Sequence, residues 1–127
     1  MIKGLNDLRV YQMAMDLAVE VRKLTLAFPL YARNELGRQR RLSAESIPAN
    51  IAEGYGRNRY EADFKRFLVT ALGSCTELGC QLELAFRHGY MSSERHGNLD
   101  ESCDHIGRSL HVMIEKWHSG PVRTSDV

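Results

Sequence analysis

Apolar residues recur at alternating steps of four and three along three long segments of this 127-residue chain. That spacing places them on one face of an α-helix, whereas a half-buried strand would place an apolar residue at every second position. The stripes cover about residues 5–28, 60–88 and 93–118, and no segment alternates with the period of a strand. The sequence therefore predicts an all-α protein.

A fourth helix is predicted over about residues 34–55, ending in the cap and turn sequence Gly54-Tyr55-Gly56. Pro29 and Gly89 separate neighbouring segments and leave only short joints between them. Four helices with short joints favour an antiparallel up-down-up-down four-helix bundle. We expect residues 1–127 to form a single domain of this kind.

Two of the segments also carry apolar residues outside their main stripe. A second apolar face needs a cover, so it favours self-association. The alternative is that the bundle itself covers it, because each helix already faces two neighbours. The residues concerned are Leu8, Tyr11, Met15 and Ala18 in the first segment, and Phe67, Val69 and Leu72 in the third.

The composition, with 43% hydrophobic and 26% charged residues, is typical of a globular protein. The first residues lack the apolar core of a signal peptide, and no run is long enough to span a bilayer. We therefore predict a cytoplasmic protein with no membrane association. The three cysteines, Cys75, Cys80 and Cys103, form no Cys-x-x-Cys pair and are interpreted as small buried hydrophobic residues.

The segment 46–54, Ser-Ile-Pro-Ala-Asn-Ile-Ala-Glu-Gly, breaks the helical pattern around it. Pro48 lacks a backbone donor and should kink or restart the helix, at about 3 kcal/mol unless compensated. The carbonyl freed near Ala44 is one that the Asn50 amide can satisfy, locally or on another helix. Small residues here predict a close helix contact, which we call the seam. Its residues are Ser46, Ile47, Pro48, Asn50, Ile51, Glu53 and Gly54, with Gly73 and Ser74 facing them.

Glu53 is open to three roles: general base, metal ligand or ion-pair partner. A single Glu115-x-x-His118 pair has the spacing of carboxylate metal sites in bundles, but such sites need two pairs. No phosphate loop or nucleophile elbow is present. We expect no catalytic residue, cofactor or metal, and therefore no enzyme. The other acid, base or ligand candidates are Glu77, Glu83, His105 and His111.

Basic residues gather around two of the joints, and we consider them the candidate binding residues. Residues 33–66 hold eight basic and five acidic residues, whereas residues 67–127 hold five basic and eight acidic, within a net charge of +1. Arginines beside Tyr55 and Tyr60 suit phosphates and unstacked bases. Ion pairing with nearby acidic residues is the alternative. The candidates are Arg38, Arg40, Arg41, Arg57, Arg59, Lys65 and Arg66.

The seam sequence and the residues that follow it carry a family resemblance. The chain resembles the bacterial four-helix bundle family that includes proteins encoded within intervening sequences of 23S ribosomal RNA genes. The same family includes the accessory variability determinants of diversity-generating retroelements. Beyond residues 46–54, the resemblance rests on Arg57, Phe64, Phe67-Leu68, Ala71, Gly73-Ser74, Glu77-Leu78, Gln81-Leu82, Ala85 and Gly89-Tyr90.

The resemblance implies a homopentamer of antiparallel bundles with no known enzymatic activity. It also implies an adaptor role, because the retroelement members bind a reverse transcriptase and nucleic acid through a strongly basic surface. This chain is near neutral, which differs from that pattern. We expect a non-enzymatic, oligomeric protein that binds RNA or DNA and a nucleoprotein partner. The alternative is a self-assembling protein-interaction module with no nucleic-acid role.

Overall fold

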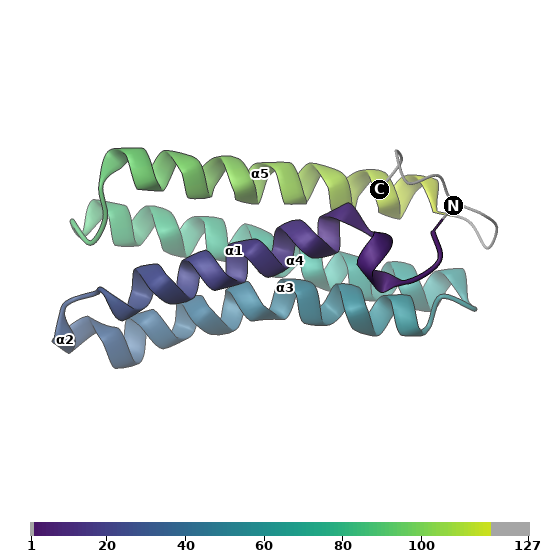
Figure 1. The fold of residues 1–127 in the computed structure, drawn as a ribbon, viewed down its shortest axis with the longest axis horizontal. Helices are drawn as coiled ribbons and strands as arrows, with labels where there is room; N and C mark the ends of the chain where they lie inside the picture. Colours follow the sequence, from purple (N-terminus) through teal and green to yellow (C-terminus); the bar gives the residue numbers. More distant parts are fainter. Residues whose placement is uncertain (1, 118–127) are drawn as a thin grey trace.

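The computed structural model describes residues 2–117, and every regular element in that range is a helix (Figure 1). The predicted all-α class is confirmed for this part of the chain. Four long helices lie side by side along the molecule, joined by short segments (Figure 1). The elements are η1 (Leu5–Asp7), α1 (Arg9–Leu26), α2 (Leu30–Ala32), η2 (Arg33–Gly37), α3 (Arg38–Gly56), α4 (Glu61–Arg87) and α5 (Ser93–Lys116).

The predicted apolar stripes of three helices form most of the core, and α3 adds Ala44, Ile47 and Ile51. Every stripe residue is buried where the structure describes it, which confirms the helical spacing. The stripe residues are Val10, Ala14, Leu17, Val21, Leu24 and Phe28 around α1; Phe64, Leu68, Ala71, Cys75, Leu78, Leu82 and Ala85 in α4; and Leu99, Cys103, Ile106, Leu110, Met113 and Trp117 around α5.

Two helix boundaries differ from the prediction. The first helix begins at Arg9 rather than residue 5, because Leu8 has extended backbone angles and separates it from η1. Leu8 is also fully buried, so placing it on a second apolar face was wrong. After Pro29 the chain becomes helical again at Leu30, earlier than the predicted residue 34. Proline suits this position because its fixed φ fits a helix start.

The joint between α4 and α5 follows the sequence signals. Gly89 has a positive φ of 83°, the conformation in which glycine ends helices. The N–H of Tyr90 donates to the carbonyl of Ala85 at 3.0 Å, and that of Gly89 to Phe86 at 2.9 Å. These bonds form a Schellman cap. The Ser92 side chain then accepts a hydrogen bond from the Arg95 N–H at 3.1 Å and caps α5.

The seam joins α3 to α4. The Ser46 and Ser74 hydroxyls lie 2.7 Å apart, and the Asn50 amide donates to the Ser46 carbonyl at 2.8 Å and to its hydroxyl at 3.0 Å. Asn50 therefore acts within its own helix. The contact with Ser74 is as predicted, but Gly73 is exposed and a Cβ there would meet no atom within 4 Å.

Helix α3 runs through Pro48 without interruption, so the helix does not restart there. The buried Ile47 and Ile51 on either side of Pro48 hold this part of α3 in the core. Gly54 lies inside α3, and a Cβ there would come within 2.9 Å of Phe67 Cβ and 3.0 Å of Phe64 Cδ1. Its role is close approach, and interpreting it as a cap was wrong.

Candidate functional site

Two arginines share one aromatic ring at the joint between α3 and α4. Arg57 follows the last residue of α3, and Arg66 lies in the second turn of α4. The guanidinium carbon of Arg57 is 5.2 Å from the centre of the Phe67 ring, and that of Arg66 is 4.7 Å away. A guanidinium over an aromatic face is attracted by the ring quadrupole. Phe67 thus holds both cations in one place.

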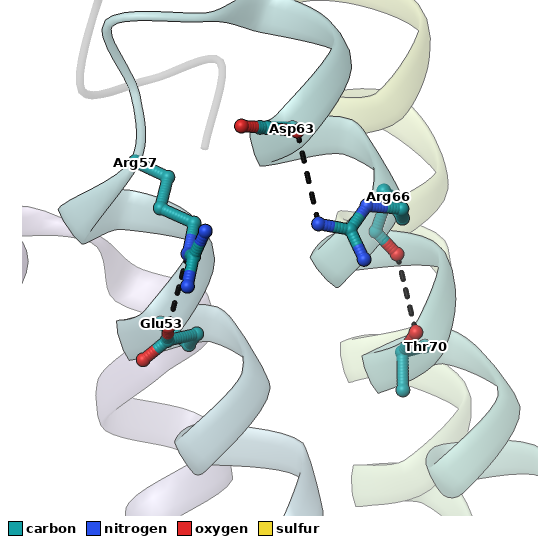
Figure 2. Close-up of polar contacts among 5 residues, drawn as sticks. All are labelled: Glu53, Arg57, Asp63, Arg66 and Thr70. Atoms are coloured by element: carbon teal, nitrogen blue, oxygen red, sulfur yellow. Dashed lines mark hydrogen bonds and ion pairs between the residues drawn. The ribbon is translucent and has the colours of Figure 1, made fainter.

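Each of these arginines also has a carboxylate neighbour in its own helix (Figure 2). Arg57 Nε lies 3.0 Å from Glu53, and an Arg66 nitrogen lies 3.7 Å from Asp63. The side chains of the first pair are 50% and 53% exposed. Glu53 is thus an ion-pair partner. Exposed pairs at this spacing are worth only about 0.3–0.5 kcal/mol, so a phosphate can compete for the arginines.

Three further residues complete this end of the molecule. Arg59 is exposed and forms no ion pair or hydrogen bond with residues 2–117. Tyr60 precedes α4 with 64% of its surface exposed. Lys65 lies 3.2 Å from Glu61 and is partly covered. We call Arg57, Arg59, Tyr60, Lys65, Arg66 and Phe67 the joint cluster.

The other three candidate arginines lie at the opposite end of α3. Arg57 comes nineteen positions after Arg38, which is about 28 Å of helix. Arg40 is only 2% exposed and donates to the carbonyls of Gln81 and Leu36 at 3.1 and 3.0 Å. Burial lowers the pKa of its guanidinium. Arg41 donates to the Thr25 hydroxyl at 3.0 Å, so only Arg38 is exposed.

The acid, base and metal-ligand candidates form no metal site among residues 2–117. The described range contains no group of three histidine, cysteine or carboxylate side chains able to hold a metal ion. Glu83 pairs with Arg87 at 3.2 Å, and His111 lies 3.1 Å from Glu115. His118, the second half of the Glu115-x-x-His118 pair, lies outside the described residues.

Two of the grooves on the surface of residues 2–117 bear on the predictions. The groove between α1 and α3 has a volume of about 380 Å³ and is mainly apolar, with Met15 and Val19 at 42% and 52% exposure. The groove along α4 and α5 has about 730 Å³ and contains acidic residues such as Asp100 and Asp104. Of the residues predicted as a second apolar face, Met15 and Val69 are exposed, and Tyr11, Ala18, Phe67 and Leu72 are half-buried.

The contact of Phe67 with both arginines was not predicted from the sequence. The sequence places this residue on the second apolar face and in the family resemblance, but no local spacing links its ring to Arg57, which is ten positions away. The adjacent Arg66-Phe67 pair in a basic segment was the one available signal.

None of the described helices is long and apolar enough to cross a membrane.

Comparison with known proteins gives a consistent family result. The family model described as 23S rRNA-intervening sequence protein matches residues 6–112. A solved structure from Bacteroides thetaiotaomicron, described as a protein of unknown function from the S23 ribosomal protein family, is 27% identical with a TM-score of 0.73. The match covers 84% of this chain and 96% of that one. No curated protein matches the chain.

Proposed function

Because the chain belongs to the 23S rRNA-intervening sequence protein family, we propose that it is a non-enzymatic RNA-binding protein whose joint cluster contacts phosphates. The observation that carries this proposal is the pair of exposed guanidiniums over Phe67, with the exposed Arg59 two residues after Arg57 in the chain. The family's link to ribosomal RNA favours RNA over DNA as the ligand. It also favours the cytoplasm as the place where binding occurs.

The chemistry of the joint cluster suits a nucleic-acid backbone. Guanidinium forks match phosphate oxygens in a bidentate manner, and the exposed ring of Tyr60 can stack on an unpaired base. Glu53 and Asp63 hold Arg57 and Arg66 only weakly, so exchanging these carboxylates for phosphates costs little. One cluster offers few phosphate contacts. A single copy should therefore bind weakly.

Self-association would multiply these contacts. We propose that antiparallel bundles of this chain form a homo-oligomer, a pentamer by family resemblance, with the apolar groove between α1 and α3 as a contact surface. An oligomer repeats the joint cluster, so several weak contacts act together on one RNA. The same assembly would serve as an adaptor for a nucleoprotein partner such as a reverse transcriptase.

A second candidate function is a self-assembling protein-interaction module with no nucleic-acid role. The observation that favours it is the neutralisation of the cluster by Glu53, Asp63 and Glu61, combined with the exposed Met15 in the apolar groove. In that case Arg57→Ala and Arg59→Ala change the assembly mass and leave RNA binding unchanged.

Gel-shift titrations distinguish the two functions. Purified protein is titrated against a structured RNA, a single-stranded RNA, a single-stranded DNA and a duplex DNA at about 50 and 200 mM salt, because phosphate contacts weaken steeply over this range. The proposal predicts a shift with RNA that weakens as salt rises. Equal affinity for duplex DNA contradicts the preference for RNA. No shift with any nucleic acid at micromolar protein and low salt contradicts the function itself.

A further inference from the structure

Two of the three cysteines meet across the contact between α4 and α5. Cys75 and Cys103 are 3% and 6% exposed, and Cys75 Sγ lies 3.1 Å from the carbonyl oxygen of Cys103. Both are free thiols. Cys80 is exposed on α4, so interpreting all three cysteines as buried was wrong for this one. Helix α4 thus carries a buried thiol, Cys75, next to Cys103 of α5, and an exposed thiol, Cys80.

The groove of about 730 Å³ along α4 and α5 leads to this pair. Both Cys75 and Cys103 line it, together with Gly79, Gly97 and Gly107. A Cβ added at Gly79 or Gly97 would meet no atom within 4 Å, so the groove is open where these residues lack side chains. The sulfurs are nearly covered, which excludes bulky reactants. A molecule of a few atoms can enter through the groove.

The surroundings of the two thiols act on their pKa values in opposite directions. Hydrogen bonds from the Cys103 side chain and the Gly107 backbone lower the pKa of Cys75, although burial and Asp104 oppose this. Contact with Cys75 and burial raise the pKa of Cys103, and Asp100 adds to the effect. These opposite directions favour a thiolate at Cys75 over one at Cys103. The thiolate is the nucleophilic form of cysteine.

We propose that Cys75 and Cys103 form a reversible thiol pair that small hydroperoxides oxidise to an intramolecular disulfide. In the first step the Cys75 thiolate attacks one peroxide oxygen, the O–O bond breaks, and the departing oxygen takes up a proton as water or an alcohol. This leaves Cys75 as a sulfenic acid.

In the second step the Cys103 sulfur attacks the sulfenic sulfur. An S–S bond forms, the S–O bond breaks, and the leaving hydroxide takes the Cys103 proton to give water. The two thiols lose two electrons in total and the peroxide gains them. The disulfide joins α4 to α5, and a thiol reductant reverses the reaction.

The test uses the folded 127-residue chain with Cys80→Ser, so that Cys75 and Cys103 are the only thiols that can react. After treatment with hydrogen peroxide the protein is denatured, alkylated with N-ethylmaleimide and weighed by mass spectrometry. The proposal predicts a protein that carries no maleimide adduct and is two hydrogen atoms lighter than the reduced, unalkylated protein. Treatment with dithiothreitol before alkylation should restore both adducts. Two remaining adducts, at a peroxide dose that oxidises Cys80 in the unsubstituted chain, would overturn it. A sulfinic acid at Cys75 beside a free Cys103 would also overturn it.

Two further variants of the Cys80→Ser protein assign the roles and the route. With Cys103→Ser, dimedone should label a sulfenic acid at Cys75; with Cys75→Ser, Cys103 should stay unlabelled. Equal labelling contradicts the assignment of Cys75 as nucleophile. Gly79→Leu places a side chain in the groove at a helix position that favours leucine, so the fold should persist and oxidation should slow. An unchanged oxidation rate contradicts access through the groove.

Discussion

At the scale of single residues, Gly54 shows how tightly α3 and α4 approach one another. An alanine there would place its Cβ within 3.2 Å of the Phe64 carbonyl oxygen as well as against two phenylalanine side chains. We expect Gly54→Ala to destabilise the protein by about 1–3 kcal/mol, as overpacking does. The measurement is the free energy of unfolding from urea denaturation.

Gly56 provides the matched control two residues away. It also lies in α3, but a Cβ there would meet no atom within 4 Å. Gly56→Ala should be neutral or stabilise the protein by up to about 1 kcal/mol, because alanine favours a helix. Equal destabilisation by the two substitutions would contradict the close approach as the reason for Gly54.

The proposed phosphate contact of Arg57 would compete with its ion pair to Glu53, and this gives a second prediction at the residue scale. Glu53→Gln removes the competing charge, so RNA affinity should rise by several-fold in a titration at low salt. Glu83→Gln breaks a similar pair with Arg87, twenty-one residues beyond Arg66 in α4, and should leave affinity nearly unchanged. The same gain from both substitutions would indicate only a general change in net charge.

At the scale of helices, the Ser92 side chain caps the start of α5. Its bond to the Arg95 N–H satisfies one of the free donors at the helix start. Ser92→Ala should cost about 1 kcal/mol of stability, whereas Ser93→Ala, inside the first turn, should cost much less. Thermal or urea unfolding of the two variants measures the difference. If they unfold alike, Ser92 is not the stabilising cap.

The stripes of α1, α4 and α5 were predictable because one helix face meets the core along its whole length. The start of the second predicted helix was not, because Pro29, which stops α1, is also the residue directly before α2. The arginines of the joint cluster were grouped from sequence because they flank one joint. The burial of Arg40 was hidden, since it depends on the Gln81 carbonyl of another helix.

At the scale of the whole molecule, the apolar groove between α1 and α3 predicts self-association. Met15→Glu places a charge in this groove and should reduce the mass measured by light scattering. Leu84→Glu changes a similarly exposed apolar residue on α4 and should leave the mass unchanged. A monomeric mass for the unsubstituted protein would contradict the oligomer and the argument from repeated clusters.

The salt dependence of RNA affinity shows whether Arg57 and Arg66 bind RNA phosphates. Removing a phosphate contact lowers the slope of log affinity against log salt by about one. Substituting both residues with glutamine should therefore lower this salt slope by about two for each joint cluster that contacts the RNA. Arg38→Gln, at the far end of α3, should leave the slope unchanged. Equal slopes for the double variant and the unsubstituted protein would contradict the account.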